Sequence, residues 1–384
     1  MNTLLEKIIE LSHEYGNRIH WVIGGGGNAS IKDENWLWIK ASGFNLGTIS
    51  AEGFVRMDLQ KVKSLLQKQY PENVEERERA AKINLLTARA PGEEDKRPSV
   101  ETGMHALFPQ SIVFHTHPAL VNGLACSREG KEATKKLFGD GVLWVPVMNP
   151  GIVLAQYMEK EIGTYTRARN GRFPRAVFLQ NHGLVAYGET PEEIHLCHTF
   201  IAQTLKSALP KSLRDRYEQW EQEEDSKLSA FSATGSEVGA VLHEFAREEL
   251  GKEATVLEDD TPLFGPFLQN EEGFTNINGA FSPDHIVYAG HRPVWVESVA
   301  SLKKAIAEYK QREGTIPRVI VVKNTGVFAL GATKNKANLC LLLARDMAKI
   351  ALLTECWGGP LFMPKEQVQF IRNWEVEQFR QRLA

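Results

Sequence analysis

Two stretches decide the fold of this chain: SIVFHTHP at residues 111–118 and AVFLQNHGLVAYG at residues 176–188. Each begins with an apolar run that predicts a buried strand, Ser111–Phe114 in the first and Ala176–Leu179 in the second. Each run leads into histidine, and a helix is predicted over about 191–208. Strands alternating with helices indicate an α/β fold, layered as in α+β proteins.

The residues upstream extend this sheet. Ala29–Lys32 and Trp36–Lys40 read as two strands around a turn at Asp33, which predicts antiparallel pairing. We therefore expect a central mixed or antiparallel sheet flanked by helices. One of these is expected over Glu101–Phe108, with Ser99 as its cap.

Composition excludes several classes of protein. The 384 residues are 42% hydrophobic and 24% charged, with 45 basic and 48 acidic side chains, a formal net charge of -3. These values are typical of a globular protein and indicate neither disorder nor a nucleic-acid footprint. The four cysteines lie far apart, and no stretch approaches 18 uncharged apolar residues, so we expect a soluble, cytoplasmic protein without a membrane partner.

The length allows two packed cores. Residues 210–236 are rich in charge and then in small polar residues, without a sustained strand pattern. We interpret this segment as a solvated helix followed by a linker. The predicted domains are residues 1–209 and residues 237–384.

An internal repeat relates the two halves. Residues 177–197 and 319–340 share Asn-x-Gly, an apolar triplet, a glycine and Leu-Cys at an offset of 143, as between Asn181 and Asn324. Upstream, Ile112–His117 resembles Ile286–His291 at a different offset. This second match predicts a strand over 286–288.

The repeat predicts that the second half has no metal site. In this alignment His115 corresponds to Ala289, His117 to His291 and His182 to Thr325. Two of three imidazoles are missing, so the second half is expected to be a degenerate copy with a structural role.

Three histidines are candidate metal ligands. His115 and His117 are two apart at the end of a strand, so both side chains face the same way. On its own such a pair is more often one core and one exposed histidine. His182 follows the next strand, in an expected strand-to-helix connection, and three imidazoles with an open position suit a catalytic zinc or another divalent ion.

Glu101 precedes this pair by fourteen residues, in the expected first turn of a helix. A carboxylate there commonly does no more than complement the helix dipole. Beside a metal ion it is also a candidate general base, which removes a proton from carbon.

Small-residue loops are candidate anion sites. GGGGNAS at 24–30 and ASG at 41–43 present backbone N–H groups together with hydroxyl and amide side chains, and Ser99 adds a third loop. A glycine run alone is more often a flexible turn, and neither a P-loop nor a dinucleotide-binding fingerprint is present.

In order, the motifs GGNxS, IKxSG, SVET with HA, HTHP and NHGLxxxG span residues 20 to about 205. This combination resembles the class II aldolase/adducin family. The chain looks most like bacterial proteins of the rhamnulose-1-phosphate aldolase type, because of its SVET motif and its C-terminal half with SPDHIVYAGHRP and KNTGVFALG.

The resemblance implies roles for individual residues. His115, His117 and His182 would be the ligands of zinc or another divalent metal, and Glu101 the acid/base group. The phosphate of the substrate would lie against the small-residue loops, at Gly27, Asn28, Ser42, Gly43 and Ser99. Val100 stands where fuculose-type enzymes carry a second serine, so phosphate binding is expected to be weaker or the substrate different.

The implied reaction is reversible cleavage of a ketose-1-phosphate, such as rhamnulose- or fuculose-1-phosphate, to dihydroxyacetone phosphate and an aldehyde. In the synthetic direction, zinc would chelate the oxygens of dihydroxyacetone phosphate while Glu101 removes a proton from the adjacent carbon. A homo-oligomer is also implied. The alternatives are a sugar-phosphate epimerase or dehydratase of the same superfamily, and a non-catalytic adducin-like scaffold.

Overall fold

The computed structural model describes residues 3–226, 236–376 and 379, and the chain divides into two compact units. The first unit comprises Met1–Val121 and Lys131–Ala208, and the second comprises Asn122–Gly130 and Leu209–Ala384. Both contain a sheet with helices packed on it, which confirms the predicted α/β architecture.

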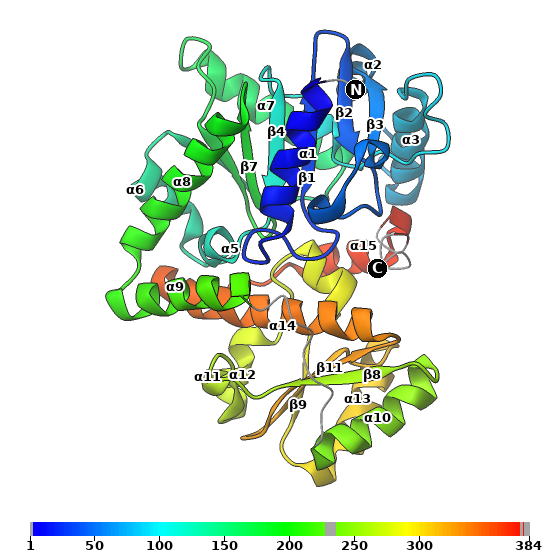
Figure 1. The fold of residues 1–384 in the computed structure, drawn as a ribbon, viewed down its shortest axis with the longest axis vertical. Coiled ribbons are helices and arrows are strands. Elements are labelled where there is room, and N and C mark those ends of the chain that lie inside the picture. The colour runs from blue at the N-terminus through cyan, green and yellow to red at the C-terminus, as the bar shows by residue number, and fades with distance from the viewer. Residues whose placement is uncertain (1–2, 227–235, 377–378, 380–384) are drawn as a thin grey trace. The chain divides into compact units, whose positions relative to one another are not determined.

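The first unit is built on a seven-stranded mixed sheet in the order β3-β2-β1-β4-β7-β6-β5 (Figure 1). Its neighbouring strands pair antiparallel except β5 and β6, which are parallel. The strands are β1 (Asn28–Lys32), β2 (Trp36–Lys40), β3 (Phe54–Asp58), β4 (Ile112–Thr116), β5 (Val142–Val145), β6 (Ala176–Leu179) and β7 (Gly183–Gly188). The helices up to residue 208 are α1 (Thr3–Gly16), α2 (Leu59–Leu66), α3 (Val74–Thr87), α4 (Thr102–His105), α5 (Ala119–Ala125), α6 (Gly130–Phe138), α7 (Ile152–Arg167) and α8 (Pro191–Ala208).

Alternating side chains of the central strands build a core on each face of this sheet. Phe114 of β4 packs with apolar residues of α1 and with Ile194 of α8. On the opposite face Val113 packs with Leu154 and Met158 of α7. With both faces covered, the central strands are held rigidly, and their ends can hold side chains in fixed positions.

The second unit contains a four-stranded sheet in the order β8-β11-β10-β9. The strands are β8 (Thr255–Asp259), β9 (Val294–Val296), β10 (Val319–Val322) and β11 (Gly326–Gly331). Its helices are α9 (Lys211–Ser226), α10 (Glu237–Leu250), α11 (Gly265–Leu268), α12 (Glu271–Phe274), α13 (Leu302–Glu313), α14 (Lys334–Thr354) and α15 (Lys365–Asn373). A π-helix spans His285–Ala289.

The second sheet repeats four strands of the first. β8, β10 and β11 begin and end 143 positions after β4, β6 and β7, and the order β8-β11-β10-β9 matches β4-β7-β6-β5. The pairing register is also shared, since Ile112 lies opposite Gly188 in one sheet and Thr255 opposite Gly331 in the other. In both, a helix joins two parallel strands, α7 between β5 and β6 and α13 between β9 and β10.

The strand predicted at 286–288 is wrong, because these residues lie inside the π-helix. Pro283 and Asp284 are already helical, since proline fits the first helical positions, and the Ser282 hydroxyl lies 2.9 Å from Nδ1 of His285. The strand that corresponds to β4 is β8, which the sequence analysis did not predict.

Other expectations need smaller corrections. The helix expected over Glu101–Phe108 is the single-turn α4, and β7 directly follows the turn after β6, where a strand-to-helix connection was expected. The helix expected to be solvated is α9, in which Tyr217 and Trp220 are buried with 3% and 7% of their surface exposed. The expected linker falls mainly on 227–235, outside the described residues.

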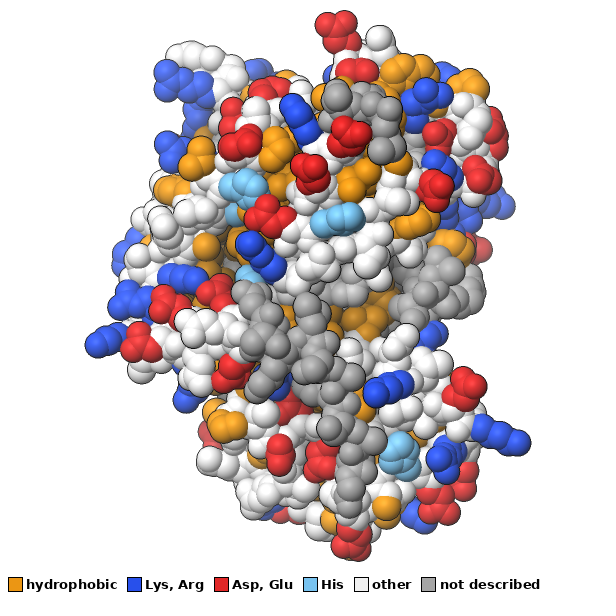
Figure 2. All heavy atoms as spheres, viewed as in Figure 1, with side chains coloured by type: hydrophobic (Ala, Val, Ile, Leu, Met, Phe, Trp, Pro, Cys, Tyr) orange, Lys and Arg blue, Asp and Glu red, His pale blue; other side chains and the backbone are white. Residues whose placement is uncertain are grey.

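No helix among the described residues is long and apolar enough to span a membrane. On the face shown in Figure 2, acidic and basic side chains are interspersed. This agrees with the small net charge.

Candidate metal centre

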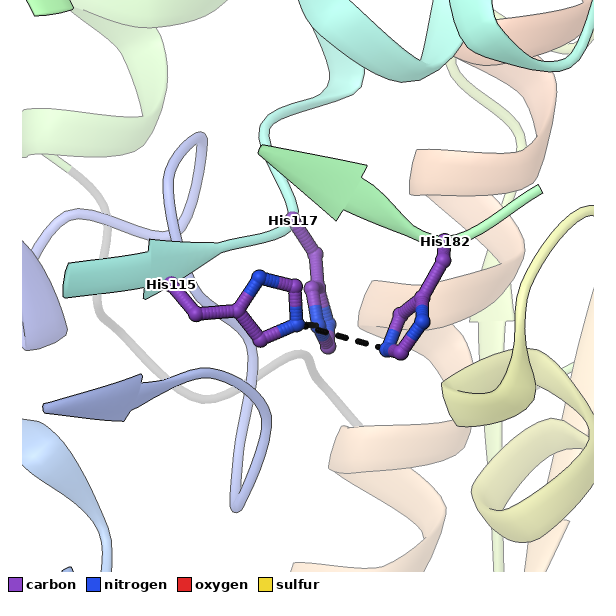
Figure 3. A group of neighbouring side chains, drawn as sticks. All are labelled: His115, His117 and His182. Carbon is purple, nitrogen blue, oxygen red and sulfur yellow. Dashed lines mark hydrogen bonds between the residues drawn. The ribbon is translucent and has the colours of Figure 1, made fainter. Parts of the chain in front are cut away.

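Three histidines meet at one end of the first sheet. His115 lies in β4, His117 just after it, and His182 in the turn between β6 and β7 (Figure 3). Nε2 of His115 lies 2.9 Å from Nε2 of His117 and 3.3 Å from Nε2 of His182. Among the residues that the structure describes, no other group of three histidine, cysteine or acidic side chains converges in this way.

The turn that carries His182 explains its position. Asn181 adopts a left-handed conformation with φ of 55°, and the amide of His182 donates to the carbonyl of Leu179 at 3.1 Å. Asparagine tolerates this conformation better than most residues. The chain therefore reverses within three residues and places His182 beside the end of β4.

The proton positions in this group fit a bound cation. Nδ1 of His115 lies 2.9 Å from the carbonyl oxygen of Leu184, which only accepts, so Nδ1 carries the hydrogen. Nε2 of a neutral His115 therefore presents a lone pair to the other two rings. A divalent ion would accept this lone pair, and fixing Nδ1 on a carbonyl is a common support for a histidine ligand.

Glu101 lies beside this group. Its Oε1 is 3.4 Å from Nε2 of His182 and 3.7 Å from Nε2 of His115, and it is a buried atom without a hydrogen-bond partner among the described residues. Its Oε2 accepts a hydrogen bond from Nδ2 of Asn28. The structure thus brings together four residues that the sequence singled out, three imidazoles and one carboxylate.

The electrostatics keep Glu101 ionised. Burial raises the pKa of Glu101, and protonated imidazoles at His115, His182, His117 and, to a smaller extent, His105 would lower it to about 2; a bound divalent cation would supply positive charge at the same place. An ionised carboxylate next to a metal site is able to accept a proton.

The small-residue loops lie around Glu101 and β2. Ser42 donates its amide to the carbonyl of Arg97 at 2.8 Å and Ser99 donates its amide to the carbonyl of Lys40 at 3.3 Å, so these two loops are bonded to one another. Gly43 has a φ of 95°. The Ser99 hydroxyl accepts from the amide of Glu101 at 3.2 Å.

Gly27 permits a close approach to the metal site. It has a φ of 67°, and a Cβ atom there would lie 2.8 Å from the carbonyl oxygen of His115. Only glycine fits this position without strain. The next residue, Asn28, pairs with His115 in the ladder between β1 and β4.

The sequence analysis gave no role to His105, which lies one helical turn after Glu101. Its side chain is buried, with Nδ1 2.8 Å from Oγ of Ser30. Burial lowers its pKa most, and despite the opposing effect of Glu101 the value is about 3. The four-residue spacing within SVETGMH was a signal that the two side chains share a helix face.

The second sheet shows what replaces the ligands in the other copy. By strand register His115 corresponds to Glu258, not to Ala289, and His117 corresponds to Asp260, not to His291. Glu258 accepts a hydrogen bond from the hydroxyl of Ser236 at 2.9 Å. The correction leaves no histidine at any of the three ligand positions, because Thr325 stands at the third.

Comparison with known proteins agrees with this site. Residues 6–208, more than half of the chain, match the model of the class II aldolase and adducin N-terminal domain. The chain belongs to this family. The family carries the predicted fold, and the histidine cluster is consistent with its divalent metal site.

Individual relatives share less than a third of their aligned residues with this chain. The chain is 24% identical over 425 aligned residues to an uncharacterized oxidoreductase, YuxG, of Bacillus subtilis, covering 99% of this chain but only 58% of that protein. It is 29% identical over 192 residues to a methylthioribulose-1-phosphate dehydratase of Microcystis aeruginosa, covering 46% of this chain and 80% of the relative. A solved class II aldolase domain from Thermoplasma acidophilum is 24% identical with a TM-score of 0.45, covering 54% of this chain and 94% of that one.

Proposed function

We propose that this protein is a class II aldolase that reversibly cleaves a ketose-1-phosphate, such as rhamnulose- or fuculose-1-phosphate, to dihydroxyacetone phosphate and an aldehyde. The observation that carries the proposal is the buried carboxylate of Glu101, held with one free oxygen beside three converging imidazoles. Family membership supports a metal-dependent enzyme.

His115, His117 and His182 would hold zinc or another divalent ion, which supplies Lewis acid chemistry that stabilises negative charge on a substrate oxygen. Glu101 exchanges the proton at the neighbouring carbon through Oε1. Because Glu101 and His115 are both buried, this exchange takes place largely away from water.

Anion recognition is assigned to the loops around Glu101. Gly27, Ser42, Gly43 and Ser99 are the proposed phosphate-site residues, with the hydroxyls of Ser42 and Ser99 among the donors. Residues 1–209 would form the catalytic domain, and residues 237–384 would have a structural role in a cytoplasmic homo-oligomer.

Dehydration of a sugar phosphate is the second candidate. The match to methylthioribulose-1-phosphate dehydratases favours it, although those relatives cover less than half of this chain. A dehydratase also removes a proton next to a carbonyl group, so Glu101 would take the same role. In aldol cleavage the carbon–carbon bond breaks first and Glu101 returns a proton to the enediolate carbon, whereas in dehydration Glu101 removes the proton and the carbon–oxygen bond of the leaving hydroxyl then breaks.

Product analysis distinguishes the two candidates. The full chain, stripped with chelator and reloaded with zinc, is incubated with rhamnulose-, fuculose- and methylthioribulose-1-phosphate. Release of dihydroxyacetone phosphate supports the aldolase, and a product lighter by one water supports the dehydratase. Turnover of none of the three by the metal-loaded protein contradicts both.

Glu101→Gln tests the role of the carboxylate. The variant should keep its metal and lose about two to four orders of magnitude in kcat, the usual contribution of a general base. Glu132→Gln, at an exposed position of α6, is the matched control and should retain full activity. Near-normal turnover in Glu101→Gln would place the base elsewhere.

A further inference from the structure

The contact between Asn28 and Glu101 points to a role for Asn28 other than phosphate binding. We infer that Asn28 is a positioning residue that holds the carboxylate of Glu101 so that one oxygen stays directed at the metal site. This inference rests on the proposed function, because it assigns a task within the same reaction.

The backbone brings the two side chains together. Asn28 lies opposite His115 in the β1–β4 ladder, and only 7% of its surface is exposed. Its Nδ2 donates to Oε2 of Glu101, while Oε1 faces His182 and His115 at 3.4 and 3.7 Å. One carboxylate oxygen is thus occupied by an amide, and the other is left for chemistry.

The carboxylate determines which way the amide points. Nδ2 of Asn28 donates to Oε2 of Glu101, so the amide oxygen Oδ1 points away from that carboxylate oxygen. Oδ1 of Asn28 then remains buried, without a partner among the described residues. An amide oxygen is an acceptor, which suits a substrate hydroxyl and not an ionised phosphate.

The helix does not fix the carboxylate by itself. Glu101 is the N-cap residue of α4, a four-residue helix, and its side chain makes no capping hydrogen bond. Its backbone amide donates to the hydroxyl of Ser99 and its carbonyl accepts from the amide of His105 at 3.2 Å, and neither bond holds the side chain. Asn28 therefore supplies the constraint on the side chain that the helix lacks.

A double-mutant cycle on turnover tests the inference. Asn28→Ala should lower kcat by about tenfold to a hundredfold, the equivalent of one hydrogen bond to a charged group. KM should change by less than about twofold for phosphorylated and unphosphorylated ketoses alike. In the Glu101→Gln background the same substitution should cost less than about twofold more, because residues that act through one another are not additive.

Two outcomes would overturn the inference. Equal loss of kcat from Asn28→Ala in both backgrounds would mean that Asn28 acts independently of Glu101. A rise in KM confined to phosphorylated substrates would make Asn28 a phosphate ligand. Asn28→Asp, which keeps the shape and removes the donor, should reproduce the kcat loss if Asn28→Ala fails to fold.

A second measurement needs no substrate. Urea unfolding midpoints of the metal-free protein are compared for Asn28→Ala, Glu101→Ala and the double variant, with Glu132→Ala replacing Glu101→Ala in a control cycle. The first pair should be non-additive and the control pair additive. Additivity in the first pair refutes the contact even if no sugar phosphate is turned over, whereas coupling without turnover refutes only the proposed reaction.

Discussion

Replacing Lys32 with methionine should stabilise the fold, increasingly so at lower pH. Lys32 ends β1 with 4% of its surface exposed, and its Nζ donates to the carbonyl oxygen of His105 at 3.4 Å. Burial, and to a smaller extent Lys63, lower its pKa from 10.5 to about 7. Methionine keeps the apolar stem and removes the amine that burial disfavours.

The sign follows from proton binding. Between pH 7 and 10.5 the unfolded chain protonates Lys32 and the folded chain does not, so this residue's contribution to stability decreases as pH falls across that range. At about 1.4 kcal/mol per pKa unit, the shift from 10.5 to about 7 lowers the contribution of Lys32 to the unfolding free energy by about 5 kcal/mol over the whole range. Between pH 9 and pH 6 alone it is about 2–3 kcal/mol.

Urea unfolding at pH 6 and pH 9 measures this difference directly. The gain in unfolding free energy from Lys32→Met over the wild type should be larger at pH 6 by about 2–3 kcal/mol. Lys7→Met, at an exposed position of α1, is the control and should show no such dependence. A gain that is equal at both pH values would refute the buried, deprotonating lysine.

Three further predictions concern the same unit. Gly27→Ala should weaken zinc binding about tenfold in a competition titration, because its Cβ would press on the carbonyl of His115; unchanged affinity would mean that the loop moves freely. Ser42→Ala should raise KM several-fold for a phosphorylated ketose and not for its unphosphorylated analogue; equal effects would leave Ser42 a structural role. His198→Phe should unfold at the same temperature as wild type at pH 8 and higher at pH 5, because burial lowers the pKa of His198 to about 3 and the unfolded chain binds the proton first; parallel melting curves would contradict this.

The strands and ligands that the sequence predicted are those with local signals. The apolar run before His115 fixes β4, and the two-residue spacing then puts His117 on the same side. His182 lies beside these two residues as the sequence predicted, although it stands in a turn between two strands and not in a strand-to-helix connection. To name His182 as a candidate ligand, it was enough that it follows β6, a strand of the same sheet as β4.

The features that the sequence did not predict depend on tertiary contacts. Ile286–Tyr288 is an apolar, β-branched and aromatic run, which is typical of a strand. It is helical because the helix begins at Pro283 and His285 is held at both ring nitrogens, by Ser282 at 2.9 Å and Asp346 at 3.2 Å. Asp346 lies more than sixty positions away on α14, and no local pattern carries that contact.

The two copies of the repeat show which features belong to the fold and which to the chemistry. Asn181 and Asn324 share a left-handed turn, with φ of 55° and 52°. Cys197 and Cys340 each donate to the carbonyl of the residue that precedes the first strand of the pair, Arg175 at 3.5 Å and Arg318 at 3.4 Å.

The asparagine turn and the cysteine contact hold a strand pair and the helix that follows it in one arrangement. Both copies of the repeat keep this arrangement, and both keep these contacts. The three histidine positions take part in no such shared contact. In the second copy Glu258 stands in place of His115 and accepts a hydrogen bond from Ser236. A ligand position is therefore free to change once its partners are lost, whereas the turn asparagine is not. For this reason the Asn-x-Gly motif reveals the repeat and the sequence of β8 does not, and Ile286–His291 resembles Ile112–His117 without occupying the same place in the fold.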